Sequence, residues 1–421
     1  MKTLPKFVAA IAFAAGVSSA LIALPLSPAV AADKEKEQPQ VSKAVAKPLK
    51  AAQDSMSAKK YQEGIAKLKE VEAMSNRTPY DTHVMNELFA FGYARLNDTN
   101  AALKYLEPGL SDGFLPPAEV NSRLVMMSKL DFQAKDYDKA LDFGNRALKA
   151  GVTNEDINLI IAQSYYIKAD FKNARKASES MADADVKRGA SPKENILQIT
   201  LNSCIKLDDA DCESRTLDRL VQFYPKQEYW RDVMSIAFDS KDANSDDRAT
   251  LEVFRLALDV DGLNGASQYT EMAQRSVEAG SPGLAQQVLE KGFAKNVFTE
   301  ARDRDRSQRL LDSAKKQAAL DQANLPKLEQ EAAAAKTGDP SIGLGIAYLS
   351  YGQYQKAVDA FNRGFAKGPV KFDAQAHLLL GIAQLKAGNK EEALKSFKVA
   401  KGTPAYERVA TLWTYHARAA S

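Results

Sequence analysis

A recurring pattern of small and aromatic residues constrains the fold of this 421-residue chain more than any other feature. The clearest copy runs Gly345, Tyr348, Gly352, Tyr354, Ala357, Phe361, Gly364 and Pro369. Small residues let two helix backbones approach closely, aromatic rings fill the seams beside that contact, and a glycine permits a tight turn. The pattern therefore predicts a pair of antiparallel helices, with Gly345 on the first and Ala357 on the second.

The same frame recurs along most of the chain. The small residue early in each second helix serves as a marker, found at Gly64, Ala102, Ala140, Ala174, Ala285, Ala357 and Ala393. The intervals of 38, 38, 34, 111, 72 and 36 residues are close to multiples of about 36. Two further units fit with Glu213 and Ala249 at the marker. A third, near residues 305–336, is the weakest, because it lacks aromatic residues and Pro326 is expected to interrupt it.

This order of residues resembles the tetratricopeptide repeat. The resemblance implies an all-α, right-handed superhelical solenoid of about ten antiparallel helix hairpins. A C-terminal capping helix over residues 407–419 would carry Trp413 and Tyr415 inward. No segment shows the alternation or the Val, Ile and Thr runs of strands, so we expect no sheet.

The chain divides into five predicted parts. They are a signal peptide (1–31), a flexible charged leader (32–48), an N-terminal repeat array (49–299), an irregular long-helix unit (300–338) and a C-terminal repeat pair with its capping helix (339–421). The leader has almost nothing to bury, which is why we expect it to be flexible.

The first residues read as a secretory signal. Lys2 and Lys6 precede an apolar stretch from residue 7 to 26, and Ala29-Val30-Ala31 follows as a cleavage site. This predicts a periplasmic protein. The alternative is an uncleaved anchor, because the stretch is about long enough to span a bilayer. No later run approaches the roughly 18 apolar residues of a membrane-spanning helix, so we expect no membrane span after cleavage.

The two cysteines, Cys204 and Cys212, are predicted to form one disulfide. Disulfides persist outside the cytoplasm. The repeat frame implies that the two side chains face each other across a hairpin. A redox-active or metal-binding pair is the weaker interpretation, since there is no C-x-x-C and no histidine within thirty residues.

Composition and motifs argue against nucleic acid binding and catalysis. Without residues 1–31, which hold two lysines and no acid, 55 basic side chains face 54 acidic ones, too few unpaired cations for a nucleic acid partner. Two S-x-x-K matches begin at Ser57 and Ser313, but neither is followed by S-D-N, so a serine-dependent envelope enzyme is the least favoured function. We expect the three histidines to be packed or surface residues. No cofactor or metal site and no enzyme activity is predicted.

Such repeats bind partners along the concave wall made by the first helix of each hairpin. The family's groove positions fall here on Glu87, Phe91, Arg95, Lys129, Phe132, Gln163, Tyr166, Ile346, Leu349, Leu385 and Lys386. Exposed together, they would form a surface for a protein or peptide partner. Alternatively, superhelical packing or the cap buries them.

The predicted function is a non-catalytic interaction scaffold, or an assembly or adaptor factor, in the bacterial cell envelope. The alternative is an accessory factor of an envelope enzyme complex, anchored in the membrane by an uncleaved N-terminal helix. Neither prediction fixes the oligomeric state.

Overall fold

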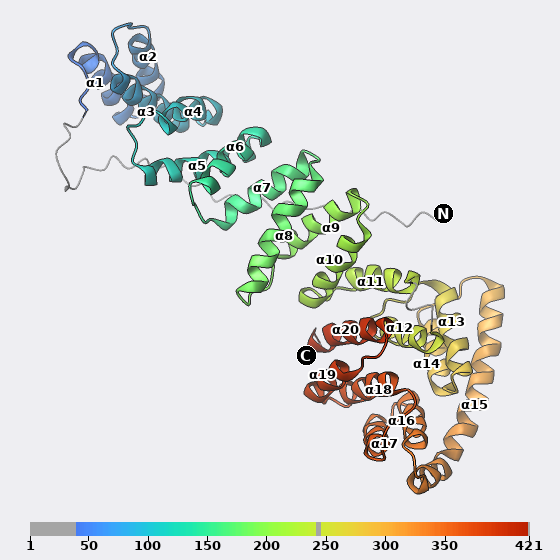
Figure 1. Ribbon diagram of the computed structural model, residues 1–421. Helices are drawn as coiled ribbons and strands as arrows, with labels where there is room; N and C mark the ends of the chain where they lie inside the picture. The colour runs from blue at the N-terminus through green and yellow to red at the C-terminus, as the bar shows by residue number, and fades with distance from the viewer. Residues whose placement is uncertain (1–38, 241–245, 420–421) are drawn as a thin grey trace. The chain divides into compact units, whose positions relative to one another are not determined.

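The computed structural model describes residues 39–240 and 246–419. Those residues form twenty α-helices and one short 3₁₀ helix, with no strand among them, which confirms the all-α prediction. The chain divides into two compact units between Asp208 and Asp209. Each unit is a succession of antiparallel helices joined by short turns (Figure 1). The predicted signal peptide, residues 1–31, lies outside the described residues.

Unit 1 is built of helix pairs that stack on one another. Its helices are α1 (Lys43–Ser57), α2 (Tyr61–Glu72), α3 (Pro79–Arg95), α4 (Thr99–Leu106), η1 (Glu107–Leu110), α5 (Pro117–Gln133), α6 (Tyr137–Lys149), α7 (Glu155–Ile167), α8 (Phe171–Lys187) and α9 (Glu194–Lys206). Each first helix from α1 to α7 packs on its own second helix, and α1 also contacts α3, α5 contacts α7, and α7 contacts α9. This is the packing that the hairpin frame predicts.

The turn inside each hairpin repeats the same backbone conformation. The residue five positions before the marker has a positive φ, between 54° and 85°, in eight hairpin turns: Lys59, Asn97, Lys135, Ala169, Asp208, Gly280, Gly352 and Gly388. In four of these turns the following aspartate accepts a hydrogen bond from the first turn of the second helix. The frame therefore holds even where Gly64 or Glu213 replaces the usual alanine.

The close approach of paired helices is visible at the glycines. A Cβ atom on Gly345 would lie 3.0 Å from the ring of Phe361, and one on Gly381 would lie 2.5 Å from the ring of Phe397. The marker alanines of these hairpins, Ala357 and Ala393, are fully buried. A ring on the second helix thus fills the space that the glycine leaves on the first, as the sequence predicted.

Unit 2 contains a second set of hairpins and three additional helices, which are its first, its longest and its last. Its helices are α10 (Ala210–Phe223), α11 (Gln227–Asp239), α12 (Asp247–Asp259), α13 (Gly265–Glu278), α14 (Pro282–Ala294), α15 (Ala301–Ala334), α16 (Asp339–Ser350), α17 (Tyr354–Ala366), α18 (Asp373–Lys386), α19 (Lys390–Val399) and α20 (Pro404–Ala419). Asp246 accepts hydrogen bonds from the backbone of Arg248 and Ala249 and so caps α12.

The last helix closes unit 2 on itself. Helix α20 packs on α18 and α19, and also on α10 and α12, which lie far earlier in the sequence (Figure 1). Arg408 of α20 binds the carboxylate of Asp218 in α10, with Nη2 2.8 Å from Oδ1. Trp413 is buried as predicted, whereas Tyr415 is only partly buried. The sequence predicted that this helix caps the end of the array, but it did not predict the contacts of the helix with α10 and α12.

Helix α15 differs from its prediction. We expected Pro326 to interrupt the helix, but α15 runs through it over 34 residues. Contacts on both sides of the proline hold the helix against α16: the hydroxyl of Tyr351 donates to Asp321 (2.6 Å) and that of Tyr348 donates to Glu329. These tertiary contacts offset the hydrogen bond that proline removes.

The leader also differs from its prediction. Residues 43–48, expected in a flexible segment, form the first turns of α1. Val45 and Leu49 are buried there against the first hairpin. The backbone N–H of Ser42 donates to Asp81 of α3 at 2.8 Å, which fixes the start of the helix. The segment orders because it has neighbours to pack on, which its composition alone does not reveal.

Candidate functional site

Three aromatic residues on the first helices of unit 1 share one arrangement. Phe91 of α3 packs edge-on against Tyr61 with ring centroids 6.2 Å apart. Phe132 of α5 meets Tyr137, and Tyr166 of α7 meets Phe171, both edge-on at 5.6 Å. All three of these first-helix residues are half-buried. Each ring is therefore held by a second ring while part of it stays open to solvent.

The charged groove residues of α3 have distinct roles. Glu87 forms a bidentate ion pair with Arg123 of α5, at 2.6 and 3.0 Å, and Arg123 is buried. That pair joins α3 to α5, so the carboxylate of Glu87 is committed to the fold. The guanidinium of Arg95 instead lies 5.1 Å from the centroid of the Phe91 ring, a cation–π contact that leaves its donors available.

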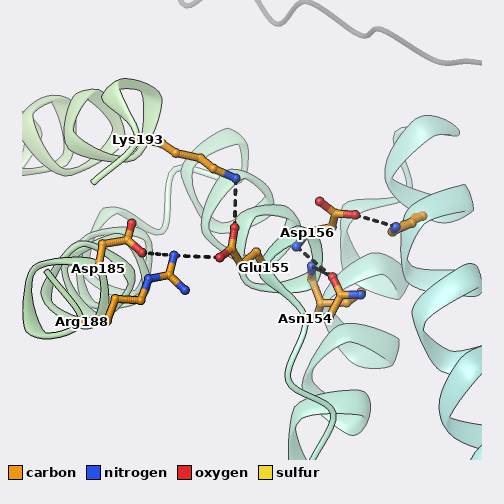
Figure 2. Close-up of polar contacts among 8 residues, drawn as sticks. Asn154, Glu155, Asp156, Asp185, Arg188 and Lys193 are labelled. Atoms are coloured by element: carbon orange, nitrogen blue, oxygen red, sulfur yellow. Dashed lines mark hydrogen bonds and ion pairs between the residues drawn. The ribbon is translucent and has the colours of Figure 1, made fainter. Parts of the chain in front are cut away.

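The N-terminus of α7 carries a group of connected polar contacts (Figure 2). Asn154 caps the helix by accepting from the N–H groups of Asp156 (2.9 Å) and Ile157 (3.3 Å). Asp156 pairs with the predicted groove residue Lys129 of α5 at 2.8 Å. Both side chains are well exposed, so this pair adds little stability and remains open to exchange for a ligand.

Glu155 ties the same helix end to the next hairpin. Its two carboxylate oxygens bind Arg188 at 2.8 Å and Lys193 at 3.1 Å (Figure 2). Arg188 also binds Asp185 at 2.6 Å. The hydrogen bond from Arg188, followed by that from Lys193, lowers the pKa of Glu155. Glu155 therefore stays ionised and links α7 to the end of α8 and the start of α9.

The remaining predicted groove residues differ in their exposure. Gln163 is 9% exposed and Leu349 is 7% exposed. Ile346 and Leu385 are partly buried, and Lys386 of α18 forms an ion pair with Asp259 of α12. Of the predicted groove residues on α16 and α18, only Leu349 is buried. In unit 1 the accessible candidates are Phe91, Arg95, Phe132 and Tyr166, with Lys129 beside them.

Sequence reasoning missed a buried acid in unit 1. Asp131 of α5 is 3% exposed, and its Oδ2 has no hydrogen-bond partner. Burial raises the pKa of Asp131 to about 6; the charge of Lys139 opposes the shift and those of Asp136 and Glu107 reinforce it. Asp131 stands nine residues before its marker, where three other hairpins have Tyr93, Tyr165 and Tyr348. An acid at a position where other hairpins have a buried or partly buried tyrosine was the available signal.

Each histidine lies near a carboxylate. His83 binds Asp112 at 2.7 Å, His416 binds Asp259 at 2.7 Å, and His377 lies 3.6 Å from Asp373 while stacking on Phe365. Burial alone would raise the pKa of Asp259, but the hydrogen bonds from His416 and Lys386 outweigh it and lower that pKa. The pair of His416 joins α20 to α12, that of His83 joins α3 to the loop after η1, and that of His377 lies within α18, in keeping with the expectation of packed or surface histidines.

The structure gives the surroundings of the cysteines and serines for which the sequence offered a metal-binding or catalytic interpretation. Cys204 and Cys212 are disulfide-bonded, so their sulfurs are not free to hold a metal. Ser57 ends α1 and Ser313 lies in the middle of α15, and both are exposed. Neither stands at the start of a buried helix, where the serine of the S-x-x-K motif is needed. Within residues 39–240 and 246–419, no helix is long and apolar enough to cross a membrane.

The repeated turn and the glycine–ring contacts define an all-α helical repeat protein. Within that class, the order of small and aromatic residues in its hairpins resembles the tetratricopeptide repeat. Residues 52–190 match the model of the RNPP family C-terminal domain. No curated protein matches the sequence.

Solved structures of similar proteins include three repeat proteins. A tetratricopeptide repeat protein from Parabacteroides merdae is 12% identical, with 79% of this chain and 98% of that one covered and a TM-score of 0.28. The TPR2AB domain of yeast Sti1, in a complex with pHSP90, is 13% identical, with coverages of 72% and 99% and a TM-score of 0.24. Yeast Tom70 is 10% identical, with coverages of 89% and 96% and a TM-score of 0.24.

Proposed function

We propose that this protein is a non-catalytic interaction scaffold, or an assembly or adaptor factor, of the bacterial cell envelope. Its partner segment would bind along the first helices of unit 1, over Phe91, Phe132 and Tyr166. The observation that carries the proposal is the shared state of these rings: each is half-buried and braced edge-on by a second ring. Braced aromatic side chains lose little conformational entropy when a partner covers them.

The surroundings of the rings suit a protein partner. Aromatic residues and arginine are the side chains that most often dominate binding energy at interfaces, and Arg95 stacks on Phe91. Exposed aliphatic side chains also lie at the C-terminal ends of first helices: Leu96 after α3 (38%), Ile167 in α7 (39%) and Ile205 in α9 (49%).

Changing Phe91, Phe132 and Tyr166 together to alanine is expected to reduce partner capture by more than about tenfold. The partner is first identified by crosslinking the tagged full chain in cells, and capture is then compared between wild type and variant. Circular dichroism checks that the helices persist, because each ring is only half-buried and its loss should leave the fold intact.

The matched control replaces two exposed apolar residues of second helices, Leu148 of α6 and Val186 of α8, by alanine. This change removes a similar kind of surface from outside the first helices and should leave capture unchanged. Undiminished capture by the triple variant would show that the binding surface is elsewhere.

The envelope location rests on the N-terminal sequence. Cleavage after Ala31 would give a mature chain that starts at Ala32, released into the periplasm. N-terminal sequencing of the protein recovered from a periplasmic extract is expected to begin at Ala32. Recovery of chains that retain Met1 in the membrane fraction would favour the anchored accessory factor instead.

A further inference from the structure

A hollow of about 350 Å³ lies between α19 and α20 in unit 2, two helices that Figure 1 shows side by side. Its floor is apolar and well packed: Phe397, Ala400 and Ala410 are each at most 3% exposed, and Leu394 is partly buried beside them. Trp413 stacks behind Phe397, with ring centroids 6.1 Å apart. The volume is at the low end of the range for small-molecule sites.

The rim of the hollow is basic. Lys398, Lys401 and Arg418 line it, against a single acid, Glu407. All three cations are exposed, and none forms an ion pair within the described part of the chain. A lysine on the same helix that points elsewhere, Lys395, is paired with Glu392 at 2.6 Å. The hollow thus gathers unpaired positive charge around an apolar floor, which suits an anion with an apolar tail.

The other polar groups of the lining restrict the ligand further. The hydroxyl of Thr411 donates to the carbonyl of Glu407 at 2.7 Å, and that of Thr414 donates to the carbonyl of Ala410 at 2.8 Å. Their protons are therefore committed within α20. The carbonyl groups of a peptide bound here would find no free hydroxyl donor on α20, whereas a plain alkyl chain has no polar group to satisfy.

We propose that this hollow binds a medium-chain aliphatic carboxylate. The carboxylate lies among Lys398, Lys401 and Arg418, and the alkyl chain lies against Leu394, the apolar side chain of the lining that is only partly buried. This binding is independent of the partner surface on unit 1, because every lining residue belongs to α19, α20 or the turn between them.

Isothermal titration of the full mature chain with hexanoate, octanoate and decanoate tests the proposal. Affinity is expected to rise about fourfold for each added methylene until the hollow is filled. Raising the salt concentration should weaken binding, because the rim charges are exposed. Octanol and octylammonium share the tail and lack the negative charge, so both should bind far more weakly than octanoate.

Two variants locate the site. Lys398→Gln, Lys401→Gln and Arg418→Gln together are expected to weaken octanoate binding by about tenfold or more. The control with the same charge change is Lys316→Gln, Lys327→Gln and Lys395→Gln, all exposed and outside the hollow. Thr411→Phe fills the hollow without changing charge and should abolish binding.

Three results would overturn the proposal: no binding by any of the three carboxylates, equal binding of octylammonium, or equal loss in the control variant. Octanoate binding that survives Thr411→Phe would place the carboxylate elsewhere on the protein and would also reject this site.

Discussion

Replacing Asp131 by asparagine is expected to stabilise unit 1 at pH 8 by up to about 3 kcal/mol, and to give no such gain at pH 4. Most substitutions of buried polar residues destabilise a protein, so the expected sign is unusual. The reason is that the folded chain holds a carboxylate at 3% exposure with an unpaired Oδ2. In the ionised form, Oδ2 has lost its water without gaining a hydrogen-bond partner.

The direction with pH follows from the raised pKa of Asp131, about 6 in the fold against an ordinary value of 3.8. Between these two values the folded state holds the proton more tightly than the unfolded state does. Stability therefore falls as the pH rises through this window, and the cost is fully present above about pH 6. Below about pH 4 both states are protonated, and asparagine and aspartic acid should behave alike.

Urea unfolding at the two pH values, followed by hydrogen exchange of peptides from α5 and α6, measures the effect. Asp138→Asn is the matched control, because Asp138 lies on α6 with 80% of its side chain exposed. Its substitution should change stability by less than about 0.5 kcal/mol at either pH. Destabilisation by Asp131→Asn at both pH values would mean that the carboxylate makes a favourable contact in the fold.

Replacing Trp413 by alanine is expected to lower the free energy of unfolding of unit 2 by about 3–5 kcal/mol. The loss should destabilise helices near the start of unit 2 as well as those near its end. Trp413 is 1% exposed and packs on Phe397 of α19 and beside His416. It belongs to α20, the helix that contacts α10 and α12 as well as α18 and α19. Loss of this one side chain should therefore be felt in helices almost two hundred residues apart.

Hydrogen exchange should show faster opening in α10, α12, α18 and α19 of the variant, with α1–α8 of unit 1 unchanged. Trp230 remains as a fluorescence reporter, since its ring lies edge-on to His416 at 6.1 Å. Thr411→Ala, an exposed change on the same helix, is the control. Loosening confined to α19 and α20 would show that the contacts of α20 with α10 and α12 do not stabilise unit 2.

The hairpins were largely predictable because they depend on local geometry. A small residue on each helix, a turn five residues before the marker and a ring in the seam all act within one repeat. The turn conformation recurs before the two weakest markers, Gly64 and Glu213. At Gly64, a Cβ atom would lie 2.8 Å from Cε of Met56, so glycine there makes room for the methionine side chain. The hairpin keeps its geometry there because the larger side chain of Met56 fills the space that the small marker residue leaves.

The interruption at Pro326 was predicted wrongly because proline was judged by its local effect alone. Tyr348 and Tyr351, on the next helix, bind acids on either side of it. Beyond it, Lys367 of α17 donates to the carbonyls of Ala332, Ala333 and Ala335 and satisfies the end of the helix. The aromatic residues that this segment lacks are supplied by α16.

The sequence by itself determined the helical class, the repeat frame and the disulfide, because each depends on residues within one hairpin. Only the tertiary structure decided which groove residues remain accessible, that α20 returns to α10 and α12, and that Asp131 is buried without a partner. These features depend on contacts between residues far apart in the chain. The residue pattern that predicts a hairpin contains no information on these long-range contacts, because every hairpin shows the same pattern of small and aromatic residues whatever packs against it.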